Sequence, residues 1–242
     1  MKYVGSKNRL SKEIAPVIQS YIDNNTITHY LEPFVGGANM IDKIDCQYKY
    51  GCDNHKYLIA LLQQTQKDTS VFPLTFDEQI YNDVKNNSAN YEDWYVGLIG
   101  FCSFGGKWFG GYPRGFQNDK ITQRDIVNET IRNLIKQAPH LKNIIFKNCD
   151  FREIKSSISN YVIYCDPPYR DTTKYSTSEF PYEEFYKWCR MMSKNNIVLI
   201  SEYTMPDDFE CIWQKQVKCM LDKNSVSDKI ERLWRYKNDN AL

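Results

Sequence analysis

The chain has 242 residues, of which 42% are hydrophobic, 14% aromatic and 25% charged, with 31 basic against 30 acidic residues. This composition excludes an intrinsically disordered chain, and the length is enough for one large domain or a core with an inserted subdomain. The longest apolar runs, such as residues 197–201, are too short to span a membrane. The first ten residues lack the apolar stretch of a secretory signal, so we expect a cytoplasmic protein.

The eight cysteines are spread along the chain without a CxxC pair, and there are three histidines. Zinc sites and disulfide frameworks are the alternative use of so many cysteines, but they usually show close spacing. We therefore expect reduced, mostly buried thiols and no metal.

The near-neutral total hides two basic zones. Residues 1–12 carry a net charge of +4, residues 100–147 carry +5, and the remainder sums to −8. This distribution indicates an anionic partner held by part of the surface, although charge also fluctuates by chance along any chain.

The N-terminal part predicts strands and helices in alternation. Residues 29–34 predict a strand that runs into Gly36 and Gly37, and residues 39–44 predict a helix. Residues 48–53 predict a second strand, which ends on a carboxylate, and residues 55–66 predict an apolar helix. The core side of that helix is expected to carry Leu58, Ile59, Leu61 and Leu62.

The interval 67–143 interrupts this alternation. It contains a glycine-rich aromatic loop at 101–116, and then a predicted helix that Thr122 caps and Pro139 ends, with Asp125 in its first turn. We interpret 67–143 as a mostly helical insertion, which holds most of the second basic zone.

The alternation resumes after the insertion. Residues 144–150, 161–166 and 197–203 predict three more strands, and residues 182–194 predict a helix opened by Pro181. This order is typical of an open α/β sheet, in which ligands bind at the carboxyl ends of the strands. The predicted strand ends carry the Gly36-Gly37 pair, Asp53, Asp150 and Asp166.

The sharpest motif is Asp166-Pro167-Pro168-Tyr169, directly after an apolar strand. Two prolines end the strand and stiffen the loop, so that a carboxylate, a carbonyl and an aromatic ring are presented together. An ordinary turn is the alternative for such a tetrapeptide alone.

Upstream, Gly36 and Gly37 follow the first strand, and Asp53 ends the second. Glycines allow close approach of the backbone to a ligand, and a carboxylate at the next strand end can accept both ribose hydroxyls. Because the glycines do not form GxGxxG, a cofactor with an adenosine but no pyrophosphate fits better than a dinucleotide.

Together these motifs resemble the Dam-like family of DNA adenine-N6 methyltransferases, in the arrangement that places the cofactor motif before the catalytic motif. The similar segments, in chain order, are YVGSK at 3–7, EPFVGG at 32–37, Asp53-Asn54, CDF at 149–151, DPPY at 166–169 and KIERL at 229–233, with a looser likeness at 104–115. Two departures are Tyr3, where the family often has tryptophan, and Ala38 in the glycine cluster.

The resemblance implies a Rossmann-like methyltransferase sheet with helices on both faces and an inserted DNA-recognition subdomain. The catalytic domain would comprise residues 1–66 and 144–242, and the target-recognition subdomain residues 67–143. It further implies S-adenosyl-L-methionine as cofactor, double-stranded DNA as partner, base flipping, and a monomer or weak dimer.

Carried onto this sequence, the resemblance also implies roles for individual residues. The residues expected to be catalytic are Asp166, Pro167, Pro168 and Tyr169. The residues expected to bind the cofactor are Tyr3, Lys7, Pro33, Phe34, Gly36, Gly37, Asp53, Asn54, Asp150, Phe151 and Asp166. Candidates for DNA contact are Lys107, Arg114, Lys120, Arg124 and Arg132.

Other interpretations of these residues and of the activity stay open. Lys7 could be a solvated surface residue, Tyr3 ordinary packing, Asp53 a turn residue, Asp150 a helix cap and Phe151 part of the core. The same tetrapeptide chemistry serves cytosine N4 or RNA amino groups, and a non-catalytic DNA-binding regulator could be built on the same fold.

Overall fold

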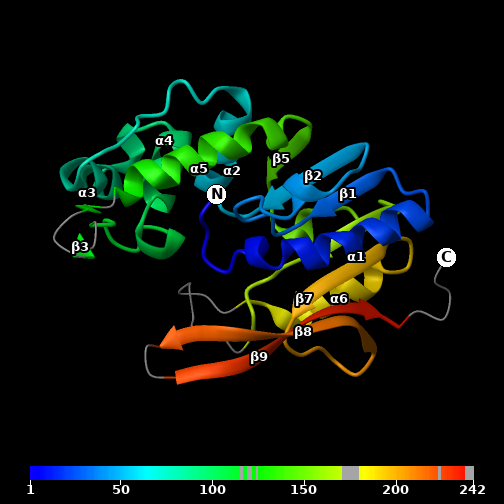
Figure 1. Cartoon of the computed structure of the whole chain (residues 1–242). Coiled ribbons are helices and arrows are strands. Elements are labelled where there is room, and N and C mark those ends of the chain that lie inside the picture. The colour runs from blue at the N-terminus through cyan, green and yellow to red at the C-terminus, as the bar shows by residue number, and fades with distance from the viewer. Residues whose placement is uncertain (115–116, 119–121, 124, 171–179, 223–224, 238–242) are drawn as a thin grey trace. The chain divides into compact units, whose positions relative to one another are not determined.

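The computed structural model describes the backbone of residues 1–114, 117–118, 122–123, 125–170, 180–222 and 225–237, and their side chains except at 117–118, 122–123, 218–222 and 225–228 (Figure 1). The chain packs as two compact units. The first comprises residues 1–11, 35–43 and 53–148, and the second residues 12–34, 44–52 and 149–242.

Six of the seven strands of the main sheet belong essentially to the second unit, in the order β2-β1-β6-β7-β9-β8. Their bounds are β1 (His29–Glu32), β2 (Tyr48–Asp53), β6 (Tyr161–Cys165), β7 (Ile197–Glu202), β8 (Phe209–Asp222) and β9 (Ser225–Tyr236). The first four in spatial order are mutually parallel, and β9 and β8 are antiparallel. The seventh strand, β5 (Ile144–Asn148), lies in the first unit.

The parallel strands form the core of the second unit. Residues 162–165 and 198–202 are buried without interruption, as expected for strands covered on both faces. Pairing places Cys165 opposite Ile200, so β6 and β7 end at the same edge of the sheet. The helices of this unit are α1 (Ser11–Asn24) and α6 (Tyr182–Met192), with one 3-10 turn, η5 (Phe151–Glu153).

The first unit is mostly helical, with α2 (Lys56–Lys67), α3 (Glu78–Asn86), α4 (Asp93–Phe101) and α5 (Ile126–Leu141) (Figure 1). Its short pieces are η1 (Lys7–Arg9), η2 (Ile41–Lys43), η3 (Ser88–Asn90), η4 (Phe104–Gly106), and the two-residue strands β3 (Gln117–Asn118) and β4 (Thr122–Gln123). Helices α2 and α4 pack closely because Gly97 has no side chain: a Cβ there would lie 2.2 Å from the carbonyl oxygen of Tyr57.

The α/β fold class is confirmed, and every predicted strand is present, with both ends within two residues of the predicted ends. The predicted helices at 55–66 and 182–194 are also confirmed, and His55 and Pro181 stand at their N-caps. The four predicted core residues of α2 are all buried.

Two helix predictions were wrong in detail. Residues 39–44 form only the single turn η2, which follows the left-handed conformations of Gly36 (φ 48°) and Ala38 (φ 55°). Helix α5 begins later than predicted because Asp125, not Thr122, accepts the capping hydrogen bond from the Asn128 amide, at 2.9 Å. It also continues past Pro139 to Leu141, although a proline removes one helical hydrogen bond and its ring crowds the carbonyl four residues earlier. Burial of Leu141 and of the apolar face of α5 favours the continued helix.

The seven cysteines with described side chains are reduced, and five of them are buried, as predicted. No group of three His, Cys, Asp or Glu side chains suited to hold a metal ion occurs among the described residues. None of the helices within the described ranges is long and apolar enough to cross a membrane.

Candidate active site

In the first unit, the glycine turn is tied to the end of β2. The backbone amide of Gly36 donates to Asp53 Oδ2 at 3.1 Å, and the amide of His55 donates to Asp53 Oδ1 at 3.0 Å. Gly36 adopts a left-handed φ of 48°, which favours glycine. The structure thus joins two motifs that are 17 residues apart in sequence.

The carboxylate of Asp53 is suited to further acceptance of hydrogen bonds. Burial raises its pKa from 3.8 to about 6, against the opposing effect of the two amides. Each carboxylate oxygen has a second lone pair beyond the one that its backbone partner uses. Asp53 therefore serves as a turn residue through His55 and keeps acceptor capacity on both oxygens, and its contact with a ribose stays a prediction.

The structure supplies a reason for the glycines that the sequence did not reveal. A Cβ built on Gly36 would lie 2.9 Å from Tyr3 Cε1, and one on Gly37 would lie 2.9 Å from Tyr3 Cβ. The Tyr3 ring also packs on Phe101, with ring centroids 5.6 Å apart. Tyr3 is therefore a packing residue against the glycine turn, and its proposed cofactor contact stays a prediction.

Two buried amide side chains that we did not predict hold the glycine turn in place. Gln137 of α5 donates to the carbonyl oxygens of Gly37, at 3.1 Å, and Ala38, at 3.0 Å. Asn39 donates to Ser6 Oγ at 2.9 Å. The sequence held one indication for Gln137: it is a polar residue on the apolar face of an amphipathic helix. A polar side chain that is buried normally has a hydrogen-bond partner.

In the second unit, the Asp166-Pro167-Pro168-Tyr169 motif directly follows β6, as predicted. Pro167 is buried and Pro168 exposed, and the Pro168 carbonyl accepts a hydrogen bond from the Tyr182 hydroxyl at 3.0 Å. Tyr169 is 9% exposed, and its hydroxyl donates to Glu231 Oε1. The tetrapeptide is therefore anchored from α6 and from β9, which is more than an ordinary turn requires.

Two carboxylates lie near Asp166 of this motif: Glu202 at the end of β7, and Glu231 on β9. Glu202 is 2% exposed, and burial, with the nearby charges of Asp166 and Glu231, raises its pKa from 4.5 to about 7. Backbone amides of Tyr203, at 2.8 Å, and Arg170, at 3.4 Å, donate to its two oxygens. Neither Glu202 nor Glu231 was among the predicted site residues.

The CDF segment is built as a local cap. The carboxylate of Asp150 accepts from the Arg152 amide at 2.9 Å and forms an ion pair with the Arg152 guanidinium at 2.7 Å, which lowers the pKa of Asp150. Phe151 is 2% exposed within the core cluster of the second unit. The cap and core interpretations of these two residues are therefore both realised, and a cofactor role stays a prediction.

The remaining cofactor candidates are distributed over both units. Lys7 lies half-buried in η1, and Asn54 is exposed beside Asp53. In the second unit Pro33 is buried, and the ring of Phe34 packs 5.6 Å from that of Phe151.

Three of the five DNA-contact candidates fall on described residues of the first unit. Lys107 and Arg132 are exposed. Arg114 is exposed as well, but its guanidinium donates to both carboxylate oxygens of Glu78, at 3.0 and 2.6 Å. Lys120 and Arg124 lie outside the described residues.

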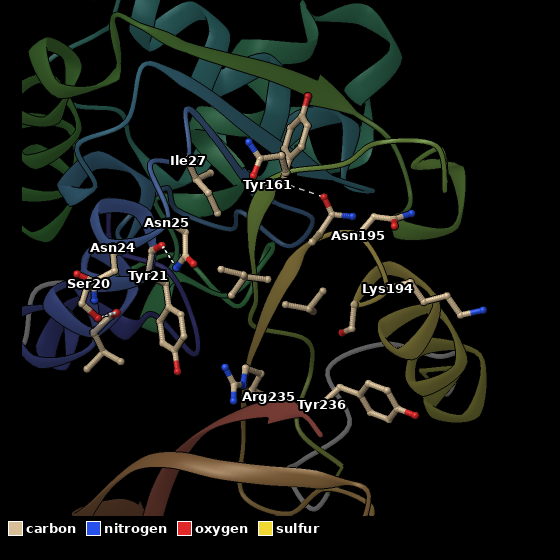
Figure 2. Close-up of a pocket in the computed structure, with 16 residues that line it drawn as sticks. Ser20, Tyr21, Asn24, Asn25, Ile27, Tyr161, Lys194, Asn195, Arg235 and Tyr236 are labelled. Carbon is tan, nitrogen blue, oxygen red and sulfur yellow. Dashed lines mark hydrogen bonds between the residues drawn. The ribbon is translucent and has the colours of Figure 1, made fainter. Parts of the chain in front are cut away.

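The second unit also contains a cavity of about 620 Å³ (Figure 2). It is lined by Tyr161 and Ile197, the first residues of β6 and β7, and by Tyr21, Asn195 and Arg235 among others. The predicted site residues do not line it, because Asp166 follows the opposite ends of these strands.

Comparison with known proteins places these motifs in a family. The model of the D12 class N6 adenine-specific DNA methyltransferases matches residues 3–98 and 112–197. The type II methyltransferase M.FokI of Planomicrobium okeanokoites is 26% identical over 195 residues, which cover 72% of this chain and 29% of that protein. The chain thus spans less than a third of the length of that relative.

Solved structures give a more distant likeness. The putative methylase HI0767 from Haemophilus influenzae has a TM-score of 0.36 at 10% identity, with 94% of this chain and 88% of that chain covered. TrmN from Thermus thermophilus has a TM-score of 0.38 at 11% identity, with 92% and 47% covered.

The family match includes the glycine turn with its Asp53 partner and the tetrapeptide after β6, and extends over more than half of the sequence. On this match, the chain belongs to the D12 class of N6 adenine-specific DNA methyltransferases.

Proposed function

We propose that the chain transfers the methyl group of S-adenosyl-L-methionine to the N6 amine of a flipped adenine in duplex DNA. The observation that carries the proposal is the anchored 166–169 motif at the carboxyl end of β6, in a chain of this family. That edge of a parallel sheet is where α/β folds bind their ligands.

The cofactor supplies an electrophilic methyl group on a sulfonium when it is bound. Asp53 fits the ribose, because both of its oxygens are held by backbone amides and retain acceptor capacity. The backbone of the Gly36-Gly37 turn would approach the cofactor. Further contacts to the cofactor are proposed for Tyr3, Lys7, Pro33, Phe34, Asn54, Asp150, Phe151 and Asp166.

The chain's contribution to the chemistry is positioning and charge. The exocyclic amine of adenine is a poor nucleophile because its lone pair is delocalised into the ring, and it is inaccessible inside the duplex, so the base must flip. The Asp166 carboxylate and the Pro167 carbonyl would each accept one hydrogen bond from the N6 amine, and Tyr169 would stack on the base. Such an arrangement accelerates transfer without a covalent enzyme intermediate.

The first unit is proposed to hold the DNA. It contains 15 basic and 11 acidic residues, a net charge of +4, whereas the second unit has 16 basic and 19 acidic residues, a net charge of −3. Lys107 and Arg132 are the exposed candidates for phosphate contact, and Arg114 would have to leave Glu78. The insertion 67–143, which lies wholly in this unit, is proposed as the target-recognition part of a cytoplasmic enzyme that is a monomer or weak dimer.

Methyl transfer from labelled S-adenosylmethionine to unmethylated, PCR-amplified genomic DNA tests the proposal. We expect wild-type transfer to adenine, and a loss of at least about a thousandfold in Asp166→Ala with cofactor binding partly retained in calorimetry. Asp207→Ala, which removes an exposed carboxylate after β7, is the control and should stay active. Full activity of Asp166→Ala would contradict the assigned role.

The same reaction separates the alternatives. Mass spectrometry of the digested nucleosides distinguishes N6-methyladenine from N4-methylcytosine, and an RNA substrate run in parallel tests the RNA alternative. A protein that binds DNA but not S-adenosylmethionine would be a non-catalytic regulator.

A further inference from the structure

A buried carboxylate on β9 faces the proposed catalytic motif. Glu231 is 4% exposed and Leu233 is fully buried, whereas Ile230, the residue before Glu231 on the same strand, is 39% exposed. Side chains two residues apart share one face of a strand, so Glu231 stands on the inward face. Because a buried carboxylate is costly unless it is hydrogen-bonded, Glu231 needs a hydrogen-bond donor.

Glu231 Oε1 accepts a hydrogen bond from the hydroxyl of Tyr169. Burial, followed by the charges of Asp166 and Glu231, raises the pKa of Tyr169 well above its ordinary value. The phenol therefore remains protonated at neutral pH, so Tyr169 is the donor and Glu231 the acceptor of this hydrogen bond.

Strand β9 also supports Tyr169 indirectly, because its Lys229 contacts Tyr203, whose ring packs against Tyr169. The ring of Tyr203 packs edge-on against Tyr169, with centroids 4.7 Å apart and an interplanar angle of 87°. The ammonium of Lys229, two residues before Glu231, lies 4.5 Å from the centroid of the Tyr203 ring. The Tyr169 ring is thus held at its hydroxyl by Glu231 and at its side by Tyr203.

We infer that Glu231 is a positioning residue, which fixes the plane of the Tyr169 ring on which the target base stacks. The inference rests on the proposed function, and it gives a role to a residue of the family-like segment 229–233, which lies outside the residues that the family model matches. Glu231 acts through Tyr169 and does not itself contact the base. The long hairpin β8–β9 would then be a support for the active site (Figure 1).

The test compares Tyr169→Phe, Glu231→Ala, Glu231→Gln and the double variant Tyr169→Phe/Glu231→Ala in the methyl-transfer reaction on PCR-amplified DNA. We expect kcat to fall roughly tenfold or more in Glu231→Ala and in Tyr169→Phe, while the Kd for S-adenosylmethionine changes less than about twofold. Glu231→Gln, whose amide oxygen can still accept the hydrogen bond, should recover most of kcat. Because each single variant removes the same hydrogen bond between Tyr169 and Glu231, the kcat of the double variant should be little lower than that of either single variant.

Glu210→Ala is the matched control, since it removes a glutamate of the same hairpin that pairs with Arg235 at 2.6 Å, and its kcat should be unchanged. Tyr169→Phe keeps the ring and its packing, so it tests the contact even where Glu231→Ala does not fold. An active wild-type chain with kcat unaffected in Tyr169→Phe, or with strictly additive losses in the double variant, overturns the inference alone. A wild-type chain that methylates no adenine overturns the proposed function, and the inference with it.

Discussion

At the scale of single residues, the glycine turn shows how one motif can serve two purposes. Glycine there was expected to let the backbone approach a ligand. The structure adds that the Tyr3 ring already lies against Gly36, while the Gly36 amide is committed to Asp53. Ala38, buried and with a φ of 55°, shows that the turn tolerates one side chain in a left-handed conformation where space exists.

We predict that Gly36→Ala lowers the free energy of unfolding by about 2 kcal/mol and weakens S-adenosylmethionine binding, because it combines strain at positive φ with a contact to Tyr3. Gly105→Ala is the control: its φ of 71° is also left-handed, but no atom lies within 4 Å of the place that a Cβ would take. Its cost should be about 1 kcal/mol in urea unfolding.

The Tyr3→Ala background isolates the contact. There, Gly36→Ala should cost no more than Gly105→Ala, since the ring that the methyl group meets is gone. An equal cost of Gly36→Ala in both backgrounds would show that Tyr3 does not dictate glycine at this position.

At the scale of elements, the ends of β6 and β7 and the inward face of β9 bring carboxylates together. Asp166, Glu202 and Glu231 come from three segments of the chain, yet their charges act on one another: both neighbours raise the pKa of Glu202. Parallel pairing of β6 with β7 and antiparallel pairing of β7 with β9 produces this arrangement.

This arrangement predicts a pH dependence of stability. The pKa of Glu202 is about 7 in the folded protein against 4.5 ordinarily, so the folded state holds a proton that the unfolded chain has already lost above pH 4.5. The free energy of unfolding should therefore fall as pH rises from about 4.5 to 7, by about 3 kcal/mol from this group. Asp53, whose pKa is also raised, acts in the same direction.

Urea unfolding at several pH values measures this slope. Glu202→Gln should remove the contribution of Glu202 and flatten the profile, whereas Glu210→Gln, at a half-buried ion pair with Arg235, should keep the wild-type slope. A Glu202→Gln profile parallel to the wild type would show that Glu202 does not carry the raised pKa.

The elements also show what could be read from the sequence. Parallel strands gave clear apolar runs, and His55 and Asp53 marked the boundary between β2 and α2. Helix α1 and the hairpin β8–β9 were not predicted. The hairpin lacks a regular alternation of apolar and polar residues, and the family-like segment 229–233 did not reveal the role of Glu231, because its partner Tyr169 lies 62 residues away.

At the scale of the whole molecule, charge is divided between the two units. Both basic zones found in the sequence, apart from Lys12, lie in the first unit, which has a net charge of +4. The near-zero total charge is therefore compatible with a DNA-binding surface. Among the predicted candidates for DNA contact, Arg114 is paired with Glu78, and Lys120 and Arg124 lie outside the described residues.

We predict that DNA binding is strongly salt-dependent, with affinity falling roughly a hundredfold between 50 and 200 mM salt if about four phosphates are contacted. Fluorescence anisotropy with labelled duplex DNA measures the slope of log K against log salt. Arg132→Ala in the first unit should reduce that slope by about one, and Lys187→Ala on α6 of the second unit should leave it unchanged. Binding that is insensitive to salt would contradict the regional interpretation of charge.

The central claim is that this chain methylates adenine at N6 in DNA. Modification-sensitive sequencing of DNA from cells that express the wild-type chain or Asp166→Ala tests it most directly, because it reports the base, the position and the sequence context together. We predict N6-methyladenine at a recurrent short sequence with the wild type and none with Asp166→Ala. N4-methylcytosine in its place, or DNA without any new modification from a well-expressed, folded wild-type chain, would contradict the claim.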